Sequence, residues 1–219
     1  MKQSVFAVIA AKNEEKHIYE VVKDTRKYVD MVIVVDDGSV DNTKGQAKKA
    51  GAVVLEHMVN LGKGAAIITG CEFALDKKAK SIILLDADGQ HEPKEIPHFL
   101  EELKKNEIVF GMRTIRKSMP SVYKFGNWVI HKLTQLLFGM DIPDTQCGYR
   151  AFRTDIFKKI RWQSSGYSME SEMIANVGKK RLKYSMIKIG TIYSDKYKGT
   201  TVKDGILIVA NLIWWRISR

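Results

Sequence analysis

The sequence predicts an α/β domain with a largely parallel central sheet and helices on both of its faces. The chain has 219 residues, of which 45% are hydrophobic, so one domain with a full core is expected. Short, continuously apolar runs alternate with segments in which apolar residues recur at helical spacing. Strands that are apolar on both faces need helices on both sides, which is the arrangement of parallel sheets.

The first half of the chain supplies five of the expected strands. They cover residues 5–10, 31–35, 52–56, 81–85 and 107–111. Helices are expected between them, over residues 13–28, 40–51, 63–78 and 92–106. Local signals support these boundaries, because Asp41 or Asn42 can cap a helix, Gly51 can end it, and Pro93 suits a first helical turn.

The second half of the chain is less regular. Residues 121–139 predict a helix whose apolar stripe suits either a core helix or one that faces a membrane. The stripe consists of Trp128, Val129, Leu133, Leu136 and Leu137. A helix that begins near Ser168 and a strand over residues 183–190 are expected after it.

The end of the chain is an apolar segment followed by arginines. Residues 205–215 read GILIVANLIWW, and Arg216 and Arg219 come after them. We expect an amphipathic helix, which either lies in a membrane interface with Trp214 and Trp215 at the headgroup level or is buried in the core.

Charge and cysteine content narrow the function classes. Lys and Arg number 36 against 25 Asp and Glu, a net charge of +11. This surplus suits nucleic acid, an acidic membrane or a phosphorylated small molecule as partner, or simply a basic soluble surface. The basic residues are scattered without a helix-turn-helix, zinc or RNA-binding signature, so we expect no nucleic-acid partner. Two cysteines fit a reducing cytosol, and no apolar run reaches the roughly 20 residues of a membrane-spanning helix.

Polar residues follow several predicted strands at the point where each strand ends. They are Asn13 and Glu14 after the first strand, Asp36 and Asp37 after the second, Asp86 and Asp88 after the fourth, and Arg113 after the fifth. Because open α/β sheets bind ligands at the carboxyl ends of their strands, we expect one site at this edge.

The stretch SIILLDADGQHEP, residues 81–93, predicts a metal site. Asp86 and Asp88 lie two residues apart on an extended segment, so their side chains share a face. Gly89 lets the backbone come close to a ligand, and Gln90 adds a neutral oxygen. A small set of oxygen ligands suits Mg²⁺ or Mn²⁺, with phosphates and waters completing the shell. The alternative is an ordinary Asp–Gly turn after a strand.

Two further stretches point to nucleotide chemistry. In VVDDGSVDNT, Asp36 can accept hydrogen bonds from a base or a ribose hydroxyl, although such acids also occur in helix caps and tight turns. In NLGKGAA, Lys63 stands between two glycines at the start of a helix, where a phosphate can bind. The spacing of a P-loop is absent.

These stretches, together with AAKNEE, GMR and DTQCGYRAF, occur in the order found in family-2 glycosyltransferases, and the chain resembles that family over residues 3–200. It looks most like the polyprenyl-phosphate sugar synthases, the dolichyl-phosphate glucosyl- and mannosyltransferases. The resemblance implies a GT-A glycosyltransferase domain over residues 1–203. Residues 204–219 would add the amphipathic C-terminal helix, which can lie at a membrane interface.

The resemblance also implies roles for individual residues. The nucleotide part of the donor would be bound by Ala10, Lys12, Glu14, Asp36 and Asp37, and Lys63 at the helix start adds a group that can bind the donor phosphates. The metal and diphosphate site would consist of Asp86, Ala87, Asp88 and Gln90, with Asp86, Asp88 and Gln90 as the metal ligands. The acceptor phosphate would be bound by Arg113, Lys198 and Lys203, and Asp88 and Arg113 would be the catalytic residues. Glu170 and Glu172 match an acidic pair that the family usually keeps.

The expected activity follows from this resemblance. The chain would transfer a hexose with inversion from UDP-glucose or GDP-mannose to a polyprenyl or dolichyl phosphate, with Mg²⁺ or Mn²⁺, bound peripherally at the cytoplasmic face of a membrane. The chemistry agrees, because a divalent cation neutralises the departing diphosphate and a phosphate acceptor is anionic without a general base. The alternatives are a hydroxyl acceptor, with Glu170, Glu172 or Asp144 as base, and, in another class, a nucleic-acid-binding module.

Overall fold

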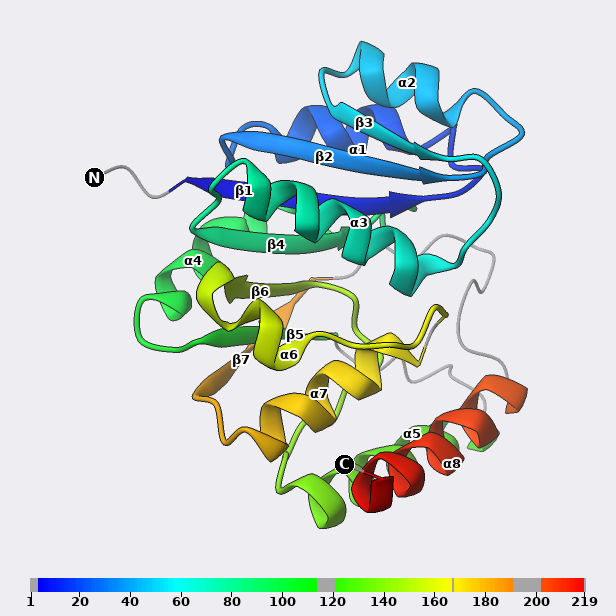
Figure 1. Cartoon of the computed structure of the whole chain (residues 1–219), viewed down its shortest axis with the longest axis vertical. Coiled ribbons are helices and arrows are strands. Elements are labelled where there is room, and N and C mark those ends of the chain that lie inside the picture. Colours follow the sequence, from blue (N-terminus) through cyan, green and yellow to red (C-terminus); the bar gives the residue numbers. More distant parts are fainter. Residues whose placement is uncertain (1–3, 114–120, 167, 191–201, 219) are drawn as a thin grey trace.

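The computed structural model of the chain describes residues 4–113, 121–166, 168–190 and 202–218 (Figure 1). Its strands are β1 (Val5–Ala11), β2 (Met31–Asp37), β3 (Val53–His57), β4 (Ser81–Asp86), β5 (Ile108–Arg113), β6 (Arg150–Arg153) and β7 (Tyr184–Ile189). Its α-helices are α1 (Ile18–Thr25), α2 (Thr43–Lys49), α3 (Lys63–Asp76), α4 (Ile96–Leu103), α5 (Ser121–Phe138), α6 (Phe157–Ile160), α7 (Met169–Lys179) and α8 (Val202–Ser218). Two 3₁₀ turns, η1 (Pro93–Glu95) and η2 (Thr154–Ile156), precede α4 and α6.

The seven strands form one sheet in the order β3-β2-β1-β4-β6-β5-β7. Strands β3, β2, β1 and β4 run parallel to one another, as do β5 and β7, so the predicted largely parallel sheet is confirmed. The exception is β6, which runs antiparallel to both β4 and β5. The apolar pattern does not predict β6, because RAFR is four residues long and begins with the buried Arg150.

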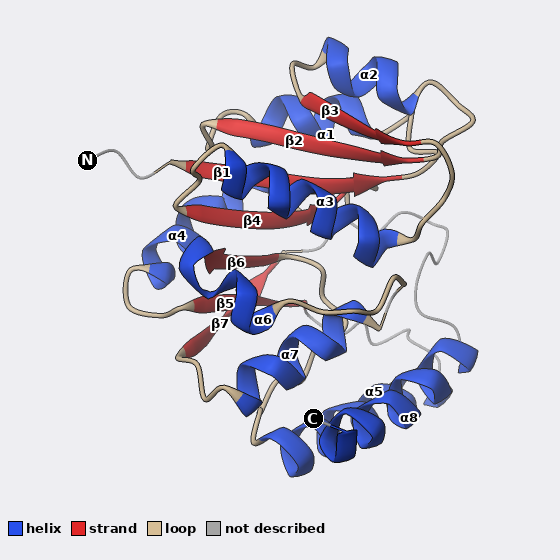
Figure 2. Cartoon of the chain, viewed as in Figure 1, coloured by secondary structure: helices blue, strands red, loops and turns tan. Residues whose placement is uncertain are grey.

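Helices cover both faces of the sheet (Figure 2). Helices α1 and α4 pack on one face, against strand residues such as Ile9 and Ile83. Helices α3, α6 and α7 pack on the other face, against residues such as Val8 and Ile82. Neighbouring strand residues enter different cores because side chains alternate along a strand, which explains why the central strands are apolar at every position.

The register of the parallel strands aligns their carboxyl ends at one edge of the sheet. Ala10 of β1 lies beside Asp86 of β4, and Ala11 lies beside Asp36 of β2. The loops that follow these strands therefore leave the sheet side by side, on the right in Figure 1. They are the loops to which the sequence assigns the site.

Helix α8 packs against α5 and α7 and has two different faces. Ile208, Leu212 and Trp215 are buried and belong to the core, which confirms a core helix for this face. The opposite face exposes large apolar residues, namely Ile206, Leu207, Ile213, Trp214 and Ile217. The membrane interface expected for this segment, and the division of the chain at residue 204, stay predictions.

Helix α5 is divided in the same way. Ile130, Thr134 and Phe138 are buried, whereas Trp128 and Leu136 of the predicted stripe are 55% and 80% exposed. The stripe therefore does not form one buried seam. Within the part of the chain that the structure describes, no helix is long and apolar enough to cross a membrane.

Candidate functional site

The loops after β1 and β2 are tied together by hydrogen bonds. The backbone N–H of Asn13 donates to Oγ of Ser39 at 2.9 Å, and the N–H of Val40 donates to Oδ1 of Asn13 at 2.9 Å. Asn13 adopts the left-handed backbone region with φ +55°, which asparagine tolerates well. Helix α1 therefore begins at Ile18, later than the predicted residue 13, because the preceding residues form this loop.

The carboxylate of Asp36 lies in the same loop pair. It is 4% exposed, and its Oδ1 accepts a hydrogen bond from the backbone N–H of Ser39 at 3.0 Å. This bond fixes the side chain at the edge where β1 and β2 end. The nucleoside-binding role of Asp36 stays a prediction.

Asp37 organises the loop that leads to α3. Its two oxygens accept hydrogen bonds from the backbone N–H groups of Leu61 at 2.9 Å and Gly62 at 2.8 Å. Nδ1 of His57 lies 2.8 Å from Oδ1 of Asp37, and Nε2 of His57 lies 3.0 Å from the hydroxyl of Thr69. These partners of Asp37 are residues of the same chain, and the contacts set the position of α3, which begins at Lys63.

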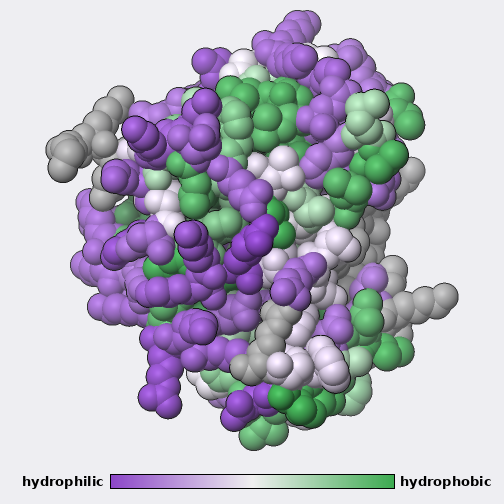
Figure 3. Space-filling model, in the orientation of Figure 1, coloured by the Kyte–Doolittle hydropathy of each residue, from purple (hydrophilic) through white to green (hydrophobic). Residues whose placement is uncertain are grey.

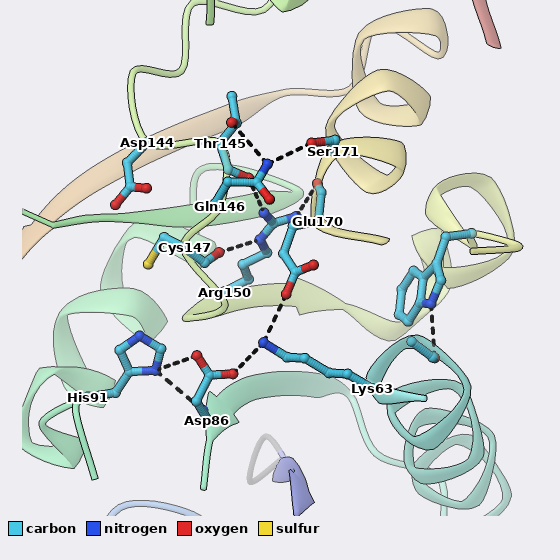
Figure 4. Close-up of polar contacts among 12 residues, drawn as sticks. Lys63, Asp86, His91, Asp144, Thr145, Gln146, Cys147, Arg150, Glu170 and Ser171 are labelled. Atoms are coloured by element: carbon cyan, nitrogen blue, oxygen red, sulfur yellow. Dashed lines mark hydrogen bonds and ion pairs between the residues drawn. The ribbon is translucent and has the colours of Figure 1, made fainter. Parts of the chain in front are cut away.

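Lys63 lies between two carboxylates. Its Nζ is 2.6 Å from Oδ1 of Asp86 and 2.9 Å from Oε1 of Glu170 (Figure 4). Burial by itself would lower the pKa of Lys63, but the two carboxylates outweigh it and hold this pKa above its ordinary value. Burial would raise the pKa of Asp86, but the positive charge of Lys63 outweighs it and holds this pKa well below its ordinary value. Lys63 and Asp86 are therefore both charged at neutral pH.

The buried Arg150 positions Glu170. Arg150 is 1% exposed, and its guanidinium donates to the carbonyl oxygens of Thr145 at 2.9 Å, Cys147 at 2.9 Å and Glu170 at 2.7 Å (Figure 4). One side chain thus joins the DTQCG loop to the first turn of α7. The Glu170 side chain is then held at Oε1 by Lys63, while its buried Oε2 has no hydrogen-bond partner among the residues that the structure describes.

Gly148 makes room for the carboxylate of Asp86. A Cβ at position 148 would lie 2.7 Å from Oδ1 and 2.8 Å from Oδ2 of Asp86, closer than carbon and oxygen can approach. The glycine in DTQCG therefore has a steric purpose at the site. The sequence motif contains this glycine, but only the fold shows which side chain it accommodates.

Asp88 and Gln90 form a tight turn after β4. Oδ1 of Asp88 accepts a hydrogen bond from the backbone N–H of Gln90 at 3.0 Å, and Gly89 between them has φ +74°. His91 is buried behind the turn, where its Nδ1 accepts the backbone N–H of Asp86 at 3.3 Å. Burial lowers the pKa of His91, so the ring is neutral and suited to accept this bond.

Arg113 pairs with Asp144. Its Nε and Nη2 donate to the two carboxylate oxygens at 2.8 and 2.9 Å, and its backbone N–H donates to the same carboxylate at 3.1 Å. Burial would lower the pKa of Arg113, but Asp144 outweighs it and holds this pKa above its ordinary value. These contacts show how the guanidinium of Arg113 is oriented. That Arg113 binds the acceptor phosphate stays a prediction.

The remaining predicted residues lie in or after the same strand ends, and Ala10 is the register partner of Asp86. Ala10 is half-buried at the end of β1, Ala87 is buried, and Lys12 is exposed. The backbone N–H of Glu14 donates to the hydroxyl of Thr43 at 2.8 Å. Lys198 and the side chain of Lys203 lie outside the residues that the structure describes. The roles of His57, His91 and Arg150 were not predicted, because only the fold shows which atoms their side chains reach. His57 reaches Asp37 and Thr69, His91 reaches the backbone N–H of Asp86, and Arg150 reaches three carbonyl oxygens.

Comparison with known proteins shows the family to which the chain is related. The model of glycosyl transferase family 2 matches residues 6–161. The chain is 31% identical over 243 residues to the UDP-N-acetylglucosamine–dolichyl-phosphate N-acetylglucosaminyltransferase of Methanococcus voltae, with 98% of this chain and 97% of that protein covered. It is 38% identical over 227 residues to an uncharacterized protein of Methanocaldococcus jannaschii, with 99% and 93% covered.

A solved structure matches the fold. Glucosyl-3-phosphoglycerate synthase from Mycobacterium tuberculosis, in complex with Mg²⁺ and uridine diphosphate, superposes with a TM-score of 0.79 at 18% identity. The match covers 99% of this chain and 80% of that one. The GT-A architecture expected from the sequence is thereby confirmed.

Proposed function

The chain belongs to the family-2 glycosyltransferases, and we propose that it transfers a hexose, with inversion, from a nucleotide-sugar to a polyprenyl or dolichyl phosphate. The observation that carries this proposal is the charged site at the strand ends beside an exposed apolar helix pair. Helix α7 brings Glu170 into the site and also packs against α8. A lipid-linked acceptor needs both features, because its phosphate must reach the donor while its chain stays in the membrane.

The Methanococcus voltae relative supports this acceptor class, because its name states transfer to dolichyl phosphate. The name of that relative states UDP-N-acetylglucosamine as the donor, whereas the family resemblance implies UDP-glucose or GDP-mannose. An experiment should therefore establish the identity of the donor sugar first.

A divalent cation, Mg²⁺ or Mn²⁺, fits the turn that follows β4. Asp88 and Gln90, with Asp86 before them, offer carboxylate and amide oxygens, which these cations prefer. Among the residues that the structure describes, no three His, Cys, Asp or Glu side chains are grouped to hold a metal by themselves. A bound cation would complete its shell with donor phosphates and water. When bound, it would supply positive charge for the departing diphosphate.

The cluster of Lys63, Asp86 and Glu170 would receive the donor sugar. Oε2 of Glu170 has no partner in the described part of the chain, and a buried acceptor in this state costs about 1–3 kcal/mol. A sugar hydroxyl would satisfy it by donating a hydrogen bond. Because Lys63 holds Oε1, the carboxylate has one orientation and would select a hydroxyl at one place on the ring. Glu170 would then contribute to the choice of sugar.

Arg113 would bind the acceptor phosphate. Its pairing with Asp144 uses Nε and Nη2 and sets the plane of the guanidinium. A guanidinium has five N–H donors, so a second anion can be bound by those that Asp144 does not use. The predicted binding of the acceptor phosphate by Lys198 and Lys203 is part of the same proposal.

The hydroxyl-acceptor alternative requires a carboxylate that can act as general base. The three candidates all have protein partners in the structure. Glu170 is held by a lysine, and Asp144 is held by Arg113. Oε2 of Glu172 accepts the backbone N–H and the hydroxyl of Ser164 at 2.9 and 2.6 Å. A phosphate acceptor needs no base, so this arrangement favours it.

Peripheral membrane binding is expected through the outer face of α5 and α8. Trp128 on α5 and Trp214 on α8 are 55% and 64% exposed, and Ile217 is 77% exposed. Figure 3 shows hydrophobic residues at the surface over the lower part of the molecule, where α8 lies. Exposed tryptophans beside aliphatic residues suit the interface between headgroups and acyl chains.

The test is a transfer assay with the purified full chain. UDP-glucose, UDP-N-acetylglucosamine and GDP-mannose are each offered with a polyprenyl phosphate or the free polyprenol, with Mg²⁺ or Mn²⁺. We expect transfer to the phosphate only, lost on chelation, and about 100-fold lower in Asp88→Asn. Asp76→Asn, at the exposed end of α3, is the matched control. Transfer to the free alcohol, or full turnover by Asp88→Asn, would contradict the proposal.

A further inference from the structure

A cavity of about 410 Å³ lies where α5, α7 and α8 end. It is lined by Leu137, Phe138, Gly178, Lys179, Lys180, Arg181 and Arg216. Four of these seven residues are cationic and none is acidic. The length of α7, about 15 Å, separates this cavity from Glu170 in the sugar-transfer site. A cavity with this lining suits an anion.

Three cations form the rim of the cavity: Lys180, Arg181 and Arg216. In the part of the chain that the structure describes, Lys180, Arg181 and Arg216 form no ion pair. Other surface cations do, as Lys104 does with Glu101. The helix dipole favours each cation at the end of its own helix, but it does not explain why two helix ends meet at one cavity without an acid between them. An anionic ligand would relieve their mutual repulsion.

The helices that form the walls of the cavity approach one another closely. A Cβ at Gly178 would lie 2.4 Å from the carbonyl oxygen of Phe138, so glycine lets α7 approach the end of α5. The ammonium of Lys179 contacts the backbone carbonyl of Trp215 and lies 5.7 Å from the ring centroid of Phe138. Arg181 has φ +51°, the left-handed region in which a helix usually ends with glycine. An arginine therefore stands at the rim despite the backbone cost.

The cavity borders the exposed apolar face of α5 and α8. Leu136, next to Leu137 of the lining, is 80% exposed, and Ile217, next to Arg216, is 77% exposed. If this face rests on a bilayer, as the proposed function requires, the cations of the cavity lie at the level of the lipid phosphates. Aliphatic and aromatic side chains would be in the acyl region and the arginines just above it.

We propose that this cavity binds the phosphate-bearing headgroup of an acidic phospholipid and so orients the enzyme on the membrane. The proposal rests on the membrane docking in the proposed function and adds a lipid preference to it. Arginine forks and lysine ammonium groups donate charge-assisted hydrogen bonds to phosphate oxygens. The apolar face alone would bind neutral and acidic bilayers equally, so the cavity would supply the preference for acidic lipid.

Vesicle binding by the full chain tests the preference. The vesicles are pure phosphatidylcholine, or phosphatidylcholine mixed with phosphatidylglycerol. The cavity variant removes three rim charges: Lys180→Gln, Arg181→Gln and Arg216→Gln. The control variant removes three exposed charges elsewhere: Lys48→Gln, Lys80→Gln and Lys105→Gln. We expect the cavity variant to bind the mixed vesicles about 100-fold more weakly, and the control variant no more than about 3-fold more weakly.

The remaining outcomes separate this inference from its premise. If the wild-type chain binds neither kind of vesicle, the membrane docking of the proposed function is wrong, and the headgroup site with it. If the wild type binds and both variants lose the preference equally, docking stands and the cavity site is refuted, because general charge explains the binding. The cavity site is also refuted if the two variants and the wild type bind the mixed vesicles with equal affinity.

Calorimetry distinguishes a headgroup site from a site for free anions. Dihexanoyl phosphatidylglycerol is titrated as a monomer into the wild-type chain, and inorganic phosphate is titrated separately. We expect the lipid to bind and the cavity variant to lose this binding. Inorganic phosphate that binds as tightly as the lipid would overturn the headgroup assignment.

Discussion

Replacing Lys63 with methionine would remove the cation that lies between Asp86 and Glu170. Their oxygens lie 2.6 and 2.9 Å from the same nitrogen, so they are separated by at most the total of these distances, about 5.5 Å. At an effective dielectric constant of about 20, two unit charges about 5.5 Å apart repel by about 3 kcal/mol. We therefore expect Lys63→Met to lower the free energy of unfolding by about 3 kcal/mol, near the range for breaking a buried ion pair.

Urea denaturation at neutral pH measures this loss. Lys77→Met, at the exposed far end of the same helix, is the control and should change the free energy of unfolding by less than about 0.5 kcal/mol. The double variant Lys63→Met/Glu170→Gln removes one of the facing charges and should recover at least half of the loss. If Lys63→Met costs less than about 1 kcal/mol, or the double variant recovers nothing, the carboxylates do not repel as the geometry requires.

Two further substitutions and one labelling experiment test other parts of the structure. Arg150→Met should lower the free energy of unfolding by about 3–5 kcal/mol in urea, because three backbone carbonyls lose a buried charged donor; a loss below about 1 kcal/mol would contradict this. Gly148→Ala should weaken nucleotide-sugar binding about tenfold in calorimetry, because a Cβ would displace the carboxylate of Asp86; unchanged affinity would show that its orientation is unimportant. Cys71 and Cys147 should resist iodoacetamide at pH 8, because burial raises both thiol pKa values, that of Cys147 to about 12; rapid labelling would contradict their burial.

The parallel strands and the edge that carries the site could be predicted from the sequence. Continuous apolar runs reveal parallel strands because both faces of such strands are buried, and this signal is local. Polar residues directly after those runs must lie at the carboxyl edge, whatever the order of the strands. Asp36, Asp86 and Asp88 were therefore found without a structure, Lys63 was found from its place between two glycines at a helix start, and the motif order indicated the family.

The partners of these residues were decided by the topology. Glu170 meets Lys63 because β6 returns antiparallel between β4 and β5 and brings α7 to the strand ends. Arg150 appears in the sequence as one polar residue in a short strand, and its three carbonyl partners become visible only in the fold. Spacing along the chain cannot show such pairs, because it contains no information on which distant segments come together.

The last helix shows the same division between local pattern and tertiary packing. The run GILIVANLIWW predicts a helix, since apolar residues recur on every side of it and no glycine or proline interrupts its later turns. It does not show which side is buried, because Trp214 and Trp215 are equally apolar neighbours. Packing against α5 and α7 buries Trp215 and leaves Trp214 64% exposed. The sequence by itself thus determined that a helix forms here, and only the tertiary contacts decided which of its faces is left for a membrane.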